Sequence, residues 1–341
     1  MCLYPRIHRN RKYEKNAKNG GNIPTVQDSR TLHVPAGCGN CIECRKQYAR
    51  NWQVRLMEDI KENKNGKFIA LTFSNQAIKE LSEGSIVRID KKTKEKVTIP
   101  ISELEGYEKD NAIAKLAVRR FLERWRKTYK KSVRHWLVTE LGHKGTENIH
   151  LHGIIWTDES MDAVEKHWKY GFIWKGHKRL GKLINYVSEA TVNYIVKYIH
   201  KVDFQHKTYK AKVLTSAGIG SNYTNTINSK ANKYKEEKTD ETYRTRSGHK
   251  IALPIYWRNK IYSEEERERL WIEKLDKQER WVRGVKIDIS KSEKGYYNAL
   301  ETAREENIRL GYGSDKKMWK REHYERQRRE ALWTYRVQNA Q

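Results

Sequence analysis

Apolar residues recur with a helical period in three segments of the chain and with the two-residue period of a strand in four others. The helical segments cover residues 41–62, 110–130 and 187–201, and the strand segments cover residues 67–74, 132–141, 149–157 and 170–174. Between them, residues 75–100 alternate charge with Gly and Ser, which indicates a solvated loop with a short hairpin at residues 86–99. The pattern predicts an α+β fold built on an antiparallel sheet.

The order of the elements predicts how the chain is organised. A strand, a helix, two strands and a helix form the skeleton of a ferredoxin-like or RRM-like sheet, and residues 63–204 contain this series. Residues 1–62 are predicted to be a basic arm with a cysteine cluster and a helix, residues 205–250 a loop or linker rich in Lys, Thr and Asn, and residues 251–341 a basic, helical extension.

Charge and aromatic content indicate a nucleic-acid partner. The chain has 70 Lys and Arg residues against 43 Asp and Glu residues, a formal net charge of +27, and it carries 11 Trp and 20 Tyr residues. Such a chain is attracted to polyanions, and its aromatic rings can stack on unpaired bases. No segment approaches the roughly 20 apolar residues of a membrane span, and the N-terminus lacks the apolar run of a signal peptide, so we expect a cytosolic protein.

A pair of histidines on one predicted strand forms a candidate metal site. Side chains alternate along a strand, so His150 and His152 face the same side while Leu151 faces the other. If residues 135–140 pair with this strand through a hairpin at residues 142–148, Glu140 supplies a third ligand from the same face. Three ligands leave positions open for a scissile phosphate. His143 and His200 lie outside this pattern and are expected to be structural or exposed.

The third helical segment carries two tyrosines with the spacing of one helix turn. Tyr194 and Tyr198 are four residues apart and therefore share a face, and Lys197 and Lys201 each follow a tyrosine by three residues. Two phenolic oxygens on one face are able to reach one phosphate in turn.

Three cysteines with regular spacing, Cys38, Cys41 and Cys44, indicate a metal site in a reducing compartment, with Cys2 as the remaining thiol. A structural zinc ion with four thiolate ligands is the preferred interpretation. An iron–sulfur cluster is the alternative metal site, and four reduced cysteines without a ligand are the third option. Elsewhere, the helix at residues 110–130 has a basic face with Arg119, Arg120 and Arg124, which are DNA-contact candidates, although a solvated face is the simpler explanation.

Taken together, the motifs resemble the HUH (His-hydrophobic-His) endonucleases, and specifically the two-tyrosine replication initiators of microviruses, the small single-stranded DNA bacteriophages. The resemblance covers roughly residues 30–205 and rests on the order of the motifs. The motifs are the strand Lys67–Ser74, the histidine pair at residues 150–152, Tyr194-x-x-Lys197, and the segment from Val34 to Arg45 that holds three of the cysteines.

The resemblance implies rolling-circle replication. In that process Mg²⁺ or Mn²⁺, held by His150, His152 and Glu140, assists Tyr194 and Tyr198 in cleaving single-stranded origin DNA, with Lys197 beside them. The product is a 5′-phosphotyrosine and a free 3′-hydroxyl. It also implies a host helicase and polymerase as partners and the cytoplasm of a bacterial host as the location. A plasmid relaxase with the same chemistry, or a non-catalytic binding protein with a zinc knuckle, would also account for the motifs.

Overall fold

The structure is a computed structural model that describes residues 2–90, 93, 95–179, 182–314, 316 and 319–338. By their internal contacts the residues form two compact units. The sheet unit comprises Leu56–Ile219 and Met318–Gln341, and the cysteine unit comprises Met1–Arg55 and Gly220–Lys317. One helix, α1 (Ile42–Glu62), contributes residues to both units.

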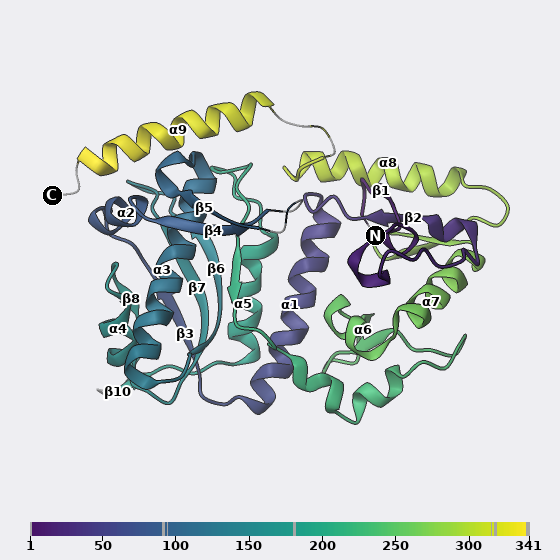
Figure 1. Cartoon of the computed structure of the whole chain (residues 1–341), viewed down its shortest axis with the longest axis horizontal. Coiled ribbons are helices and arrows are strands. Elements are labelled where there is room, and N and C mark those ends of the chain that lie inside the picture. The colour runs from purple at the N-terminus through teal and green to yellow at the C-terminus, as the bar shows by residue number, and fades with distance from the viewer. Residues whose placement is uncertain are drawn as a thin grey trace. The chain divides into compact units, whose positions relative to one another are not determined.

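The sheet unit is built on a five-stranded antiparallel sheet with the strand order β11-β6-β7-β3-β8. Its strands are β3 (Gly66–Leu71), β6 (Arg134–Leu141), β7 (Ile149–Trp156), β8 (Ile173–Trp174) and β11 (Val213–Thr215). In the chain, β3 is followed by helix α3 (Gly106–Tyr129), then by the β6–β7 hairpin. Because β7 inserts between β3 and β6, the hairpin occupies the middle of the sheet (Figure 1).

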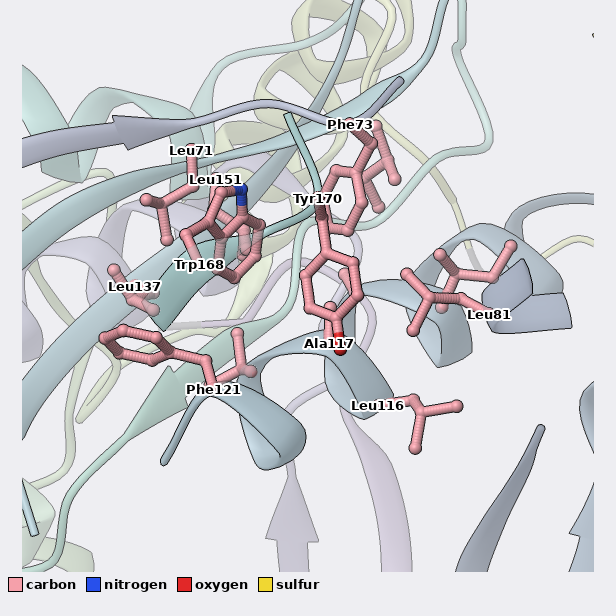
Figure 2. Packing of buried hydrophobic residues seen from close by; sticks show 14 of the residues in the cluster. Leu71, Phe73, Leu81, Leu116, Ala117, Phe121, Leu137, Leu151, Trp168 and Tyr170 are labelled. Atoms are coloured by element: carbon pink, nitrogen blue, oxygen red, sulfur yellow. The ribbon is translucent and has the colours of Figure 1, made fainter. Parts of the chain in front are cut away.

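The two faces of the sheet are covered by different helices. Helix α3 packs against β7 on one face, and helix α5 (Glu189–His200) packs against β6, so that the sheet lies between them (Figure 1). On the α3 face, Leu71, Leu137 and Leu151 meet apolar side chains of α3 such as Phe121 (Figure 2). Trp168 is fully buried in the same cluster. The α3 face is therefore the hydrophobic core, which leaves the other face for polar groups.

Shorter elements complete the sheet unit. They are α2 (Asn75–Ser82), α4 (Met161–Trp168), the hairpin of β4 (Ser85–Ile89) and β5 (Lys96–Pro100), the hairpin of β9 (His177–Arg179) and β10 (Lys182–Ile184), and α9 (Trp319–Gln338). Helix α9 lies beside α2 and α3 (Figure 1). The buried Arg329 on α9 forms an ion pair with the buried Asp110 on α3, at 2.8 Å. This pair joins the end of the chain to the core.

The cysteine unit contains two small cores. One gathers the cysteines with Leu3, Ile42, Leu300 and Ala303, and the other centres on the fully buried Trp257. Its elements are the hairpins β1 (Arg6–Arg9) with β2 (His33–Ala36), β12 (Thr242–Arg244) with β13 (Lys250–Ala252), and β14 (Glu279–Val282) with β15 (Val285–Asp288), and the helices α6 (Ile255–Ile261), α7 (Glu264–Asp276) and α8 (Lys294–Arg309).

The mixed α+β architecture with antiparallel sheets and a cysteine-rich N-terminal region agrees with the sequence prediction. The prediction of a continuous solvated loop at residues 75–100 is wrong in its first part, because Ser74 caps helix α2 and Ile78 and Leu81 are buried in the core. The segment 205–250, predicted as a loop or linker, contains short elements and buried aromatic rings, among them Tyr209, Tyr223 and Tyr243. Among the described residues, no helix is both long and apolar enough to cross a membrane.

Gly153 is required by the close approach of β6 and β7. A Cβ atom at this position would lie 2.1 Å from the carbonyl oxygen of Trp136 and 2.8 Å from Cα of Leu137. We expect Gly153→Ala to push the hairpin strands apart and to lower the free energy of unfolding by about 3 kcal/mol or more. Denaturant unfolding measures this loss. The control is Gly295→Ala in α8, where no atom lies within 4 Å and the stability should hold; equal stability of both variants would contradict the assigned register.

Candidate active site and metal centres

The β6–β7 register places three metal-ligating side chains on the sheet face opposite the hydrophobic core. Glu140 is the direct cross-strand partner of His150, and His152 lies two residues further along β7. Nε2 of His150 lies 3.0 Å and Nε2 of His152 lies 2.9 Å from the same carboxylate oxygen, Oε2 of Glu140. One oxygen thus faces both imidazoles, as the sequence predicted for the pairing of these strands.

The charges of this group suit a cation. Burial raises the pKa of the Glu140 carboxyl, but the two imidazoles more than offset it and lower the pKa to about 2. His152 is buried enough that neither ring nitrogen reaches water, and neither makes a well-aligned hydrogen bond with a described residue. The ligand atoms of all three residues lie within 4.8 Å of one another. Two imidazoles and a carboxylate are a donor set that binds divalent metals, so this group can hold one.

Helix α5 carries the tyrosine pair onto the same face. The helix begins with a capping box between Ser188 and Thr191, and its apolar side is buried, which leaves the tyrosines on the polar side. The Tyr198 ring stacks on the His152 ring with centroids 4.6 Å apart and planes within 9°. The Tyr198 hydroxyl donates a hydrogen bond of 2.6 Å to the Tyr194 hydroxyl. Both phenols therefore lie together beside the metal-ligating group.

The phenol of Tyr198 is neutral in this environment. Burial, the hydrogen bond with Tyr194 and the negative charge of Glu140 all raise the pKa of Tyr198. A bound divalent cation would oppose the effect of the negative charge, because the ion is the largest local charge in such a site. The arrangement thus links the reactivity of the phenol to occupation of the metal group.

The lysines of α5 are exposed and lie less directly at the site. Nζ of Lys197 lies 5.6 Å from the centroid of the Tyr194 ring. Lys201 caps the end of α5 through its backbone, and its side chain faces solvent. Lys197 is therefore placed to attract a phosphate near Tyr194.

A cavity of about 610 Å³ opens on the same sheet face, beside His152 and Tyr194. Trp174 on β8 and His152 on β7 are both register partners of Ala70 on β3, so the cavity and the metal group share one row of the sheet. Aromatic rings form much of its wall, with Phe68 and Trp174 centroids 5.1 Å apart and Trp174 and His177 centroids 5.0 Å apart. The side chain of Asn185 is fully used in bridging Phe68 and Lys175, which holds the wall in place.

The three arginines of α3 lie on the helix that covers the core face, away from this group. Arg119 pairs with Glu123 at 3.5 Å, and Arg120 pairs with Glu80 at 3.3 Å. Arg124 donates hydrogen bonds to the carbonyls of His167 and Trp168 and to the hydroxyl of Tyr170. The structure therefore gives Arg124 a structural part at the end of α4, and contact of these three residues with DNA stays a prediction.

The four cysteines converge in the cysteine unit. The sulfur atoms of Cys2, Cys38, Cys41 and Cys44 lie within 4.8 Å of one another, and those of Cys2 and Cys41 are 3.9 Å apart. Backbone N–H groups of Tyr4 and Cys38 donate to the Cys2 sulfur, and those of Asn40 and Cys41 donate to the Cys38 sulfur. Such donors stabilise thiolates, so the cluster can bind a metal ion.

Without a cation the cluster holds its charge unevenly. The hydrogen bond from the Cys44 thiol lowers the pKa of Cys41 to about 4, and the same contact raises the pKa of Cys44. Burial raises the pKa of Cys2. One thiolate among thiols is therefore the favoured state of the metal-free cluster, and a cation is needed to stabilise more of them.

Comparison with known proteins points to replication. Residues 105–203 match a family model described as "Replication-associated protein", of the ORF2 type, and this stretch contains the metal-ligating group and both tyrosines. No curated protein and no solved structure gives a significant match to the chain. The match supports a replication initiator family and covers under a third of the sequence.

Two features of the sheet unit escaped the sequence analysis. The aromatic wall of the cavity comes from separate segments, and only the strand pattern at β3 hinted that Phe68 shares a face with His152. A third group of ligating side chains, His143, Asp203 and His206, also converges. The spacing of Asp203 and His206, three residues apart just after α5, was the available signal for it.

The carboxylate of Glu140 is the part of the metal group that a substitution tests most cleanly. Glu140→Gln keeps the size of the side chain and removes its charge, so we expect the affinity for Mn²⁺ at this site to fall by more than about 10-fold. Mn²⁺ titration followed by electron paramagnetic resonance measures the change. Glu83→Gln, at an exposed glutamate after α2, is the matched control; equal Mn²⁺ affinity of both variants would remove Glu140 from the ligand set.

Proposed function

We propose that this protein is a replication initiator that nicks single-stranded origin DNA by tyrosine transesterification and rejoins the strands in rolling-circle replication. The observation that carries the proposal is the stacking of the Tyr198 ring on His152, one of the three metal-ligating residues. A nucleophile in direct contact with a metal ligand is placed for attack on a phosphate held at the same centre. The family match over residues 105–203 supports the role in replication.

The strand order supports the proposed fold. Without the edge strand β11, the order β6-β7-β3-β8 with helices after β3 and β7 is that of a split β-α-β, or ferredoxin-like, sheet. We infer that the sheet unit has the HUH endonuclease fold, with His150 and His152 on its central hairpin. The cysteine cluster supports an assignment to the microvirus initiators rather than to plasmid relaxases.

In the proposed reaction the phenolic oxygen of Tyr198 forms a bond to the scissile phosphorus, and the bond from phosphorus to the 3′-oxygen breaks. The products are a 5′-phosphotyrosine and a 3′-hydroxyl that takes up a proton, so no nucleotide hydrolysis is needed. Mg²⁺ or Mn²⁺ held by Glu140, His150 and His152 would supply the Lewis acidity that withdraws charge from the phosphate. Lys197 adds positive charge near the phenols.

The second tyrosine fits a cyclic process. Tyr194 accepts the hydrogen bond of Tyr198 and is itself 44% exposed, so a second phosphate has access to it. One tyrosine can hold the old 5′ end while the other cleaves the regenerated origin. A helicase and a polymerase of a bacterial host would be the partners of this cycle, in the host cytoplasm.

We also propose that the four cysteines hold a structural zinc ion. Four ligands at zinc–sulfur distances of about 2.3 Å around one ion are about 3.8 Å apart, which is close to the 3.9 Å between the Cys2 and Cys41 sulfurs. An iron–sulfur cluster, with several irons between the sulfurs, requires a wider cage. The single-ion spacing therefore favours zinc.

A covalent adduct tests the nicking reaction. In Mn²⁺, labelled single-stranded fragments of the cognate replicon should give a protein–DNA adduct that survives denaturing electrophoresis. Changing both Tyr194 and Tyr198 to Phe should abolish it, because no phenol then lies beside His152, whereas Tyr324→Phe at an exposed tyrosine of α9 should leave it intact.

The metal dependence gives a second readout of the same reaction. EDTA should suppress the adduct in the native protein without preventing DNA binding at low salt, because the net charge of +27 remains. Tight binding of every fragment with no adduct in Mn²⁺ would favour a non-catalytic single-stranded DNA-binding protein instead.

The aromatic cavity is a place for a base of the origin strand next to the scissile phosphate. Stacking of one base on an aromatic side chain contributes about 1–3 kcal/mol. We therefore expect Trp174→Ala to weaken binding of an origin oligonucleotide by roughly 5- to 100-fold. An abasic nucleotide beside the cleaved bond should weaken binding to the native protein and have little further effect on this variant.

Fluorescence anisotropy measures these affinities, with Trp281→Ala at an exposed tryptophan of β14 as the control. If the abasic nucleotide weakens binding equally in the native protein and in Trp174→Ala, the base does not occupy this cavity.

A further inference from the structure

A third group of ligating side chains lies in the sheet unit, apart from the residues assigned to nicking. His143 follows β6 directly, and Asp203 and His206 follow the end of α5. One ligand atom from each lies within 4.8 Å of the others, and Nε2 of His143 is 3.0 Å from Oδ2 of Asp203. The group therefore brings together the loop of the β6–β7 hairpin and the segment after the tyrosine helix.

The hydrogen bonds around His206 determine which ring nitrogen carries its proton. Glu325 accepts hydrogen bonds from the backbone and hydroxyl of Thr208 and, at 2.6 Å, from the hydroxyl of Tyr107. Because Tyr107 gives its only proton to Glu325, its oxygen can only accept from Nδ1 of His206, 3.3 Å away. The proton of a neutral His206 ring thus belongs on Nδ1.

Nε2 of His206 then carries a lone pair and faces other acceptors. The carbonyl oxygen of Gly142 lies 3.1 Å from it, and Oε2 of Glu147 lies 3.4 Å from it. The His206 side chain is fully buried, and Glu147 is already paired with Arg328 and Arg329. Lone pairs that face one another in a buried site require a cation between them, either a second proton on the ring or a metal ion.

Asp203 divides its two oxygens in a way that suits a metal ion. Oδ1 accepts the backbone N–H groups of Gln205 and His206, which fixes the carboxylate. Oδ2 is left to face His143. The His143 side chain is 44% exposed, so an ion has a route from solvent into the group.

We propose that His143, Asp203 and His206 bind a divalent transition-metal ion of the zinc type. Two imidazoles and one carboxylate are a typical ligand set for such an ion, with the fourth position open to water. The hydrogen bond from His206 Nδ1 to Tyr107 acts as the outer support that orients a metal-ligating imidazole.

The position of the group gives the ion a structural part. Gly142 begins the loop that connects Glu140 to His150, and Asp203 follows the helix that carries Tyr198. An ion at this point fixes the end of the tyrosine helix to the hairpin. The proposal stands independently of the nicking reaction, because metal content can be measured without DNA.

Metal content of the full chain tests the proposal. The native protein and its variants are loaded with Zn²⁺, freed of unbound metal by gel filtration and analysed by mass spectrometry for zinc per chain. His143→Ala and Asp203→Asn should each lose about one equivalent of zinc relative to the native protein. The amide that Asp203→Asn introduces keeps an oxygen for the two backbone donors, and His143 is partly exposed, so both variants should fold.

His249→Ala, at an exposed histidine next to β13, is the control and should lose no zinc. Co²⁺ loading separates this site from the cysteines. The near-ultraviolet charge-transfer band of thiolate ligands should persist in His143→Ala while weaker visible absorption falls. Equal zinc content in the native protein, His143→Ala and Asp203→Asn would overturn the proposal and assign the buried cation on His206 to a second proton.

Discussion

The pairing of β6 with β7 is the constraint on which the rest of the candidate site depends. A shift of one residue would turn Glu140 toward the hydrophobic core and separate it from His150 and His152. Gly153 prevents such freedom, because its position against the backbone of β6 admits no side chain. The same register keeps Leu137 and Leu151 in the core, so that packing on one face fixes the geometry of the other.

The three ligand groups of the chain share one physical feature, which is an excess of lone pairs in a partly enclosed space. At the active site one carboxylate oxygen faces two imidazoles, and in the cysteine cluster four sulfurs crowd together. At His206 a ring nitrogen faces a carbonyl and a carboxylate. In each case a cation lowers the free energy of the arrangement, and at the active site the same cation would serve the phosphate chemistry.

Local periodicity was enough to predict the parts of the site that lie on regular elements. The alternation around Leu151 places His150 and His152 together, and a four-residue spacing does the same for Tyr194 and Tyr198. Glu140 followed from an assumed hairpin that the structure contains. Helix α2 was missed because eight residues give too short a period, and Arg124 looked free because its carbonyl partners leave no trace in the sequence. The cavity and the His143 group depend on tertiary contacts, which a single sequence does not reveal.

The central claim is that Glu140, His150 and His152 form one metal centre in contact with the tyrosine pair. A crystal of the full chain grown with Mn²⁺, with anomalous scattering recorded at the manganese edge, tests it most directly. The account predicts an anomalous peak about 2.0–2.2 Å from Oε2 of Glu140 and Nε2 of both histidines, on the face where Tyr198 stacks on His152. An ordered sheet with both histidines in place and no manganese among these three residues would contradict it.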